Sequence, residues 1–305
     1  MEQHIERPNL TWHYFDDNSQ EAIAFLHKNF SFHPLDFEDV EAGPQQPKVD
    51  FYSDYLFGIF HFPAEQNGDS IHVFEVDIFM SENYLITVSK GENNILKRIF
   101  QKAKKDKTYQ EEIMGKDGAF LLYKLLDALT DDCWPRVRKI SGQINDIEEE
   151  IYSEKMQKTT LQKIAFVKRN LIRLKRIIYP QQLAISLLVR TNDLSYLPPA
   201  LNIYYDDIND TLQRLQMITE SHVDVMNSLH NVNESLISQR TNEVIKLLTV
   251  ISVSLLPMTI LTGLYGMNVE GLPFVDHPNS IWLLFGGVLL AIACIMIYFR
   301  RRGWL

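Results

Sequence analysis

The sequence predicts an α+β cytoplasmic domain, with a sheet flanked by helices, followed by a long helical stalk and two C-terminal transmembrane helices. Three observations predict this architecture. Short runs rich in aromatic and β-branched residues occupy the N-terminal third, a helical pattern without breaks follows, and two long uncharged runs lie near the C-terminus. With 305 residues and 46% apolar composition, the chain is long enough for one large domain plus additional elements.

The N-terminal part carries the pattern of a mixed sheet. Strands are expected at 10–15, 48–63, 70–80 and 83–90, and Asn67-Gly68 is a hairpin signal between the second and third. Amphipathic helices are expected at 19–29, with Ser19 as the N-cap, and at 94–105. Because strands and helices alternate loosely, a sheet flanked by helices is favoured over a barrel.

The pattern becomes helical after Gly118. Apolar residues recur at spacings of three and four from 119 to 189. An acidic run at 146–150 precedes a basic run at 168–176. Two solvated faces of an antiparallel helix pair explain these runs, and an ion-handling surface is the alternative that the sequence leaves open.

A second helix begins after Pro198-Pro199 and contains neither Pro nor Gly from 200 to 256. It continues into the first uncharged run, so the sequence predicts one helix of about 65 residues, on the order of 100 Å long. A periodic helix of this length indicates packing against other helices or other chains.

Residues 247–265 and 281–299 contain no charged side chain. Each run would be about 28 Å long as a helix, close to the thickness of a bilayer core. Lys and Arg flank the two runs at Arg240, Lys246 and 300–302 but are absent from the loop at 266–280. The positive-inside rule therefore predicts that both termini are cytoplasmic.

The bulk composition excludes several classes of function. A net charge of −9 argues against nucleic-acid binding, which needs a basic surface. Cys133 and Cys294 are too few and too far apart for a disulfide framework or a metal knuckle. The polar N-terminus predicts no cleaved signal peptide. Since no phosphate loop, nucleophile elbow or metal-hydrolase signature is present, neither an enzyme nor a bound cofactor is expected.

A polar stripe follows the long helix at a period of about 3.5 residues. It consists of Ser221, Asp224, Ser228, Asn231, Ser235, Ser238, Asn242, Ile245, Thr249, Ser252, Leu256, Thr259, Gly263 and Gly266. Exposing such a stripe to lipid would cost free energy, because its polar groups would lack hydrogen-bond partners there. Close helix packing through small residues is one explanation. The other is a water-filled path enclosed by several copies of the helix, which also explains why the stripe continues below the membrane.

Asp224 is the only ionisable residue on the stripe. Amides and hydroxyls suit contact with a divalent cation that keeps its water, and Mg²⁺ gives up water reluctantly. At the end of the first span, a ring of Asn268 amides would offer carbonyl oxygens to the waters of such an ion. Ile245 and Leu256 are the apolar positions of the stripe and are predicted to form hydrophobic constrictions that gate the path.

The end of the first span resembles that of the CorA family of magnesium channels. The resemblance rests on Pro257, Thr259, Gly263, Tyr265 and Gly266-Met267-Asn268, followed by a second span and a basic tail ending in Trp304-Leu305. It extends over the whole chain. The resemblance implies a funnel-shaped homopentamer in the inner membrane, with the first span lining the pore. It implies uptake of hydrated Mg²⁺, with Co²⁺ and Ni²⁺ as further ions. The selectivity site would be Gly266, Met267 and Asn268. The implied pore-lining residues are Asn242, Ile245, Thr249, Ser252, Leu256, Thr259 and Gly263.

The sequence departs from the family at one position. Members that sense cytoplasmic Mg²⁺ use an acidic residue where this chain has Asn231, so regulation is expected to be weak or to rely on Asp224, Glu220 or Glu234. The zinc-transporting branch of the superfamily is the main alternative. It usually varies the middle residue of the motif, so Met267 favours magnesium. A membrane-anchored signalling or structural protein is the alternative without transport.

Seven segments follow from this interpretation. They are an α/β domain at 1–118, a helical hairpin at 119–197, a stalk helix at 198–246, a pore helix at 247–268, an external loop at 269–280, a second span at 281–299 and a basic tail at 300–305.

Overall fold

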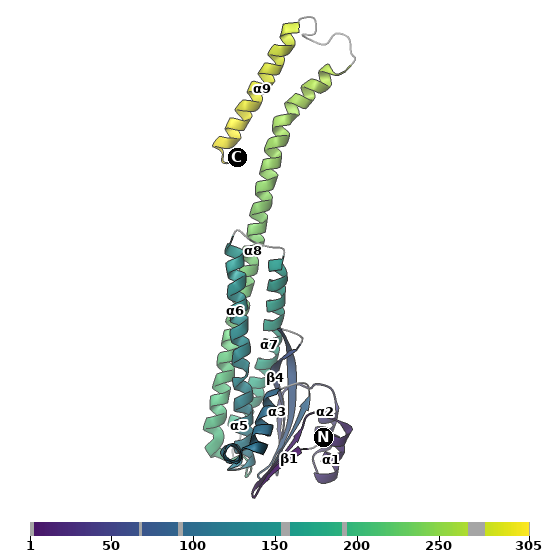
Figure 1. Ribbon diagram of the computed structural model, residues 1–305, viewed down its shortest axis with the longest axis vertical. Helices are drawn as coiled ribbons and strands as arrows, with labels where there is room; N and C mark the ends of the chain where they lie inside the picture. The colour runs from purple at the N-terminus through teal and green to yellow at the C-terminus, as the bar shows by residue number, and fades with distance from the viewer. Residues whose placement is uncertain are drawn as a thin grey trace. The chain divides into compact units, whose positions relative to one another are not determined.

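A computed structural model describes residues 3–66, 69–90, 94–153, 159–190, 194–267 and 278–304. The chain divides into two compact units, Met1–Leu229 and His230–Leu305. The first unit contains a sheet with helices on both faces, and the described residues of the second are mainly helical (Figure 1).

The first unit is built on one six-stranded sheet with the order β1-β2-β6-β5-β4-β3. Neighbouring strands are antiparallel, except that β2 and β6 are parallel. The strands are β1 (Gln3–Arg7), β2 (Leu10–Phe15), β3 (Lys48–Phe51), β4 (Leu56–Gln66), β5 (Ser70–Met80) and β6 (Tyr84–Lys90).

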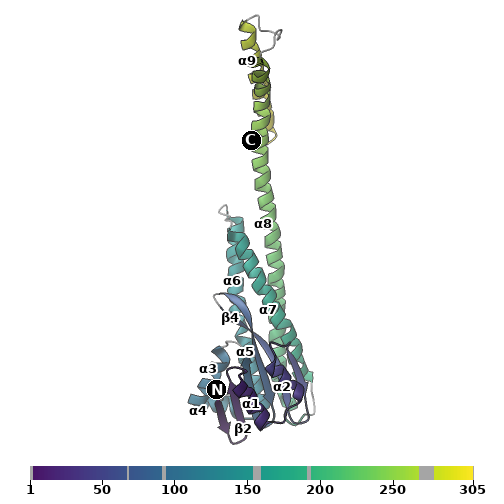
Figure 2. The ribbon, with the colours of Figure 1, turned by 90° about the vertical axis from the view of Figure 1, so that its right-hand side faces the viewer.

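Helices cover both faces of this sheet (Figures 1 and 2). On one face, α1 (Gln20–Asn29) and α2 (Pro34–Glu41) enclose an aromatic cluster in which Phe32 stacks on Phe79 at 4.0 Å between ring centroids. On the other face, Phe100 of α3 (Asn94–Lys105) packs against Trp12 at 5.0 Å. Burial of large apolar side chains on both faces is the main stabilising contribution to this unit.

Most of the predicted elements are confirmed. Strands β2 and β5 and helix α3 have the expected bounds, and the Ser19 hydroxyl caps α1 by accepting from the Ala22 N–H. The prediction of a single strand over 48–63 is wrong, because a turn separates β3 from β4. The Tyr52 N–H donates to the Tyr55 carbonyl across this turn. Strand β1, helix α2 and helix α4 (Lys107–Met114) are additional to the sequence prediction.

The helical run after Gly118 comprises α5 (Gly118–Asp131), α6 (Cys133–Tyr152) and α7 (Thr159–Arg190). Helix α7 packs on β3, β4 and β5, where its polar side chains satisfy backbone groups of the strands. Gln181 accepts from the His61 N–H at 2.8 Å, and Asn170 accepts from the Ile71 N–H at 3.2 Å. These bonds pair strand N–H groups that would otherwise be buried without partners.

The long helix is continuous. Helix α8 runs from Asn202 to Tyr265, beginning in the first unit and ending in the second, with Pro257 inside it. In the second unit, α9 (Pro278–Arg301) runs back beside the C-terminal part of α8 in the opposite direction (Figure 1). In the described residues, these two helices are long and apolar enough to cross a membrane.

Candidate functional site

The polar stripe on the second unit's part of α8 is open to solvent in the single chain. Ile245 and Leu256 are 53% and 61% exposed, and Asn242, Ser252, Thr259 and Gly263 are also exposed. Thr249 is half-buried. An open hollow of about 570 Å³ lies along this surface below the first span. It is lined by Ser235, Ser238, Gln239, Asn242, Glu243, Ile245 and Lys246.

The buried face of this part of α8 lies roughly opposite the stripe. Val250, Ser254 and Leu261 are 2%, 8% and 6% exposed, and at about 100° per residue they fall within about 40° of one another. By the same rotation the stripe residues Ile245 and Leu256 lie about 220° to 240° from Val250. The helix therefore buries one narrow face and leaves the stripe available for another chain or for water.

The threonines of the stripe hydrogen-bond within their own helix. The Thr249 hydroxyl donates to the Ile245 carbonyl at 2.7 Å, and the Thr259 hydroxyl donates to the Leu255 carbonyl at 3.0 Å. A hydroxyl has one hydrogen and two lone pairs, so its oxygen then faces outward only as an acceptor. Waters held by a cation point their hydrogens away from the ion, and a wall of acceptors is suited to receive them.

Helix α8 ends at the predicted selectivity motif. The Gly266 N–H donates to the Thr262 carbonyl at 2.9 Å, and the Met267 N–H donates to the Leu264 carbonyl at 3.3 Å. A Cβ on Gly266 would lie 2.9 Å from that same Thr262 oxygen, so a larger residue would force the backbone apart. Both residues are exposed, and Asn268 lies outside the described residues.

The acidic residues considered for regulation differ in how they are paired. Glu220 contacts Lys175 at 3.2 Å, and this lysine lowers the pKa of Glu220 below its usual value. Glu234 contacts His230 at 3.4 Å. Asp224 is exposed and has no ion pair in the described residues, and Asn231 is exposed as well. Asp224 is therefore the carboxylate that remains available to a cation.

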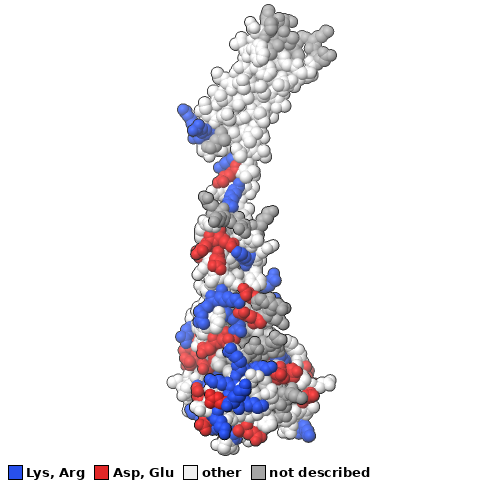
Figure 3. All heavy atoms as spheres, viewed as in Figure 1, with Lys and Arg blue, Asp and Glu red and all other residues white. Residues whose placement is uncertain are grey.

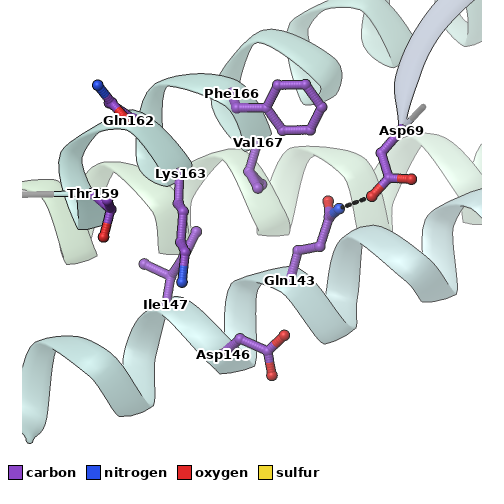
Figure 4. Close-up of a pocket in the computed structure, with 9 residues that line it drawn as sticks. All are labelled: Asp69, Gln143, Asp146, Ile147, Thr159, Gln162, Lys163, Phe166 and Val167. Atoms are coloured by element: carbon purple, nitrogen blue, oxygen red, sulfur yellow. Dashed lines mark hydrogen bonds between the residues drawn. The ribbon is translucent and has the colours of Figure 1, made fainter. Parts of the chain in front are cut away.

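A groove of about 600 Å³ lies between α6 and α7 in the first unit (Figure 4). It is lined by Asp69, Gln143, Asp146, Ile147, Thr159, Gln162, Lys163, Phe166 and Val167. Within it the Gln143 amide donates to the Asp69 carboxylate at 3.0 Å, and Lys139 contacts the other Asp69 oxygen at 2.8 Å. These contacts attach the β4–β5 hairpin to α6.

In the described residues, no group of three or more His, Cys, Asp or Glu side chains is arranged to hold a metal ion.

A buried charged cluster inside the sheet is absent from the sequence prediction. Lys90 contacts Glu75 at 2.8 Å and Asp77 at 2.9 Å, and His61 contacts Glu75 at 2.8 Å. Burial raises the pKa of Asp77 to about 7, while His61 and Lys90 hold the pKa of Glu75 below its usual value against the opposing effect of burial. The sequence signal was the pair of acidic residues two apart within the largely apolar β5.

The family model described as "CorA-like Mg2+ transporter protein" matches residues 8–301. The chain belongs to the CorA family. Among curated relatives, the cobalt/magnesium transport protein CorA of Thermotoga maritima is 31% identical over 90% of this chain and 78% of its own length. The putative metal ion transporter YfjQ of Bacillus subtilis is 29% identical over 98% of this chain and 92% of its own length.

Solved structures share the fold of this chain. The complete structure of the CorA magnesium transporter from Methanocaldococcus jannaschii superposes with a TM-score of 0.81 at 20% identity, covering 99% of this chain and 93% of that one. The cytoplasmic domain of ZntB from Vibrio parahaemolyticus gives 0.63 at 18% identity over 77% of this chain and 90% of its own. The first likeness establishes the fold over nearly the whole chain, and the second establishes it over the part that the domain covers.

Proposed function

We propose that this CorA-family chain carries hydrated Mg²⁺ across the inner membrane as a homo-oligomer, most simply a pentamer, with Co²⁺ and Ni²⁺ as further ions. The observation that carries the proposal is the placement of the polar stripe opposite the buried face of α8. A helix with that arrangement can pack on its own unit with one face and line a shared path with the other.

The chemistry of the stripe favours an ion that keeps its water. Carbonyl and hydroxyl oxygens can accept from the waters around Mg²⁺, whereas stripping those waters would require a dense set of charged oxygen ligands. From Asn242 to Gly266 the stripe has no charged side chain. Ions would enter past Gly266, Met267 and Asn268 and pass Thr259, Ser252 and Thr249 before reaching the cytoplasmic side. The relatives named for cobalt and magnesium transport support this choice of ions over zinc.

The orientation follows from the charges on the flanks. Arg240 and Lys246 precede the first span and the three arginines from Arg300 follow the second. With these cations in the cytoplasm, both termini and the sheet domain lie inside the cell and the Gly266-Met267-Asn268 motif faces outward.

Reconstitution tests the proposal. The full chain in liposomes that contain a Mg²⁺-sensitive dye should admit Mg²⁺, and a panel of Co²⁺, Ni²⁺ and Zn²⁺ should rank zinc last. Asn268→Ala removes the proposed amide ring without adding bulk or charge, so influx should fall at least tenfold while assembly persists. Influx of Asn268→Ala at the wild-type rate would show that the selectivity assignment is wrong, and preferential zinc influx would favour the zinc branch.

A further inference from the structure

The C-terminal end of α9 has a defined cap. Gly303 adopts a φ of +71°, a left-handed conformation that glycine reaches without steric cost. The Gly303 N–H donates to the Arg300 carbonyl at 3.2 Å, and the Trp304 N–H donates to the Phe299 carbonyl at 3.0 Å. These two bonds form a Schellman motif, which reverses the chain and brings Trp304 back onto the helix.

Aromatic contacts hold this reversed end in place. The Trp304 ring stacks on Phe299 with 5.2 Å between centroids and 26° between planes. The Arg302 guanidinium lies 5.7 Å from the centre of the Tyr298 ring. Trp304 remains 39% exposed and Tyr298 56% exposed. An indole and a phenol that are fixed but open are suited to the boundary between lipid and water.

Three successive arginines, Arg300, Arg301 and Arg302, surround this cap and are exposed. In the part of the chain that the structure describes, no carboxylate forms an ion pair with any of them. Blue side chains of Lys and Arg gather at this end of α9, next to a surface that shows no charged residue in the same view (Figure 3). A guanidinium presents donors in a fork that matches two oxygens of one phosphate.

We propose that this C-terminal cap, from Tyr298 to Trp304, binds the headgroups of anionic phospholipids. The arginines would take the phosphates, and Trp304 would lie at the level of the glycerol backbone. The apolar length of α9 favours lipid over a soluble acidic partner, because a spanning helix brings its capped end to the membrane surface. The inference requires α9 to span the membrane and is independent of Mg²⁺ transport.

Native mass spectrometry of the full chain in detergent, titrated with phosphatidylglycerol or phosphatidylcholine, tests this assignment. We expect tighter binding of phosphatidylglycerol to the wild type. In the variant Arg300→Gln/Arg301→Gln/Arg302→Gln, the apparent Kd for phosphatidylglycerol should rise about fivefold or more, the factor associated with one cation at an anionic surface. The Kd for phosphatidylcholine should stay the same.

A second triple variant controls for the loss of charge elsewhere. Lys104→Gln/Lys105→Gln/Lys107→Gln removes three exposed cations near the end of α3 and should leave lipid binding unchanged. Replacing the three arginines by lysine keeps the charge, so this variant should retain most of the preference for phosphatidylglycerol over phosphatidylcholine. It supplies a test if the variant with three glutamines fails to assemble. Equal phosphatidylglycerol binding by the wild type and the variant with three glutamines would overturn the proposal. Displacement of the lipid by inorganic phosphate, beyond the effect of chloride at equal ionic strength, would overturn the headgroup assignment in favour of a general phosphate site.

Discussion

At the scale of single residues, the hydroxyl of each stripe threonine already gives its hydrogen to its own helix. Thr259 donates to the Leu255 carbonyl at 3.0 Å, so its oxygen acts outward as an acceptor. The same bond occurs at Thr262, which donates to the Met258 carbonyl at 3.0 Å but lies about 110° from the centre of the stripe. The two threonines therefore form a matched pair that separates a pore-lining role from a role within the helix.

Thr259→Val keeps the shape of the side chain and removes the acceptor from the proposed path. We expect Mg²⁺ influx into liposomes to fall at least about fivefold, since each lost acceptor for a water bound to the ion costs about 1 kcal/mol, a factor of about five. Thr259→Ser should keep most of the influx, and Thr262→Val should leave it unchanged. An equal loss of influx in Thr259→Val and Thr262→Val would instead assign both hydroxyls to helix stability.

The buried carboxyl of Asp77 predicts a pH dependence of stability. Its pKa is about 7 in the folded state and 3.8 without the protein's influence. Between these values the folded state holds a proton that the unfolded state has released, so this group's contribution to the free energy of unfolding falls as the pH rises from about 4 to about 7. Above pH 7 Asp77 is ionised in both states, so the free-energy cost of burying its charge has its full value. Lys90, which contacts both Asp77 and Glu75, offsets part of this cost.

Asp77→Asn removes the cost of the buried charge. We expect it to raise the free energy of unfolding at pH 8 by about 1 to 3 kcal/mol and at pH 5 by less than half as much, since one pKa unit corresponds to about 1.4 kcal/mol. Urea unfolding of the full chain in detergent, followed by tryptophan fluorescence, measures this difference. Asp54→Asn, at an exposed position, is the control and should show no such pH dependence. Destabilisation by Asp77→Asn at both pH values would mean that its ion pair with Lys90 outweighs the cost of burial.

At the scale of elements, α8 combines a buried apolar face with a stripe whose apolar positions are Ile245 and Leu256. These two lie eleven residues apart, about 16 Å along the helix. If rings of these side chains face one another in an oligomer, they form dry constrictions that a hydrated ion crosses only at high cost. In the alternative, the two side chains pack between neighbouring helices and have no part in gating.

Polar substitution distinguishes gating from packing. Under gating, Ile245→Ser and Leu256→Ser wet the constrictions, and Mg²⁺ influx should rise severalfold. Under packing, the same changes leave cavities that cost about 2 to 4 kcal/mol, so the oligomer should weaken and influx should fall. Dye influx into liposomes, normalised to the amount of assembled oligomer, measures the outcome. Unchanged or lower influx in both variants would rule out the gate.

At the scale of the whole molecule, two candidate spans in one chain are too few to enclose a water-filled path, and the exposed stripe needs neighbouring copies. Closed rotational symmetry would bring the same stripe of each copy to a common axis. The oligomer is therefore the unit of the proposed function, and the single chain supplies one wall of the path.

Light scattering of the detergent-solubilised chain, corrected for bound detergent, checks this assembly. We expect a protein mass close to that of five chains of 35.5 kDa. Asn268→Ala and Thr259→Val should give the same mass, which separates their effects on influx from effects on assembly. A monodisperse monomer that still conducts Mg²⁺ would contradict the shared path.

The sequence by itself determined the features that depend on local pattern. The continuity of α8 into the first span follows from residues 200–256, which contain neither Pro nor Gly, and the bounds of β2, β5 and α3 follow from side-chain periodicity and composition. The two candidate spans follow from uncharged length alone. Each of these properties is decided by residues that are close together in the chain, so it can be recognised without knowledge of the fold.

Only the tertiary structure decided which distant residues meet. The parallel pairing of β2 with β6, the Gln181 bond to the backbone of β4 and the contacts of Lys90 with Glu75 and Asp77 join residues that no local pattern relates. The buried face of α8, at Val250 and its neighbours, likewise follows from packing. The polar stripe could be predicted from the sequence, but its position opposite that buried face could not. Periodicity defines which residues share a face of a helix, whereas burial depends on what the fold places against it.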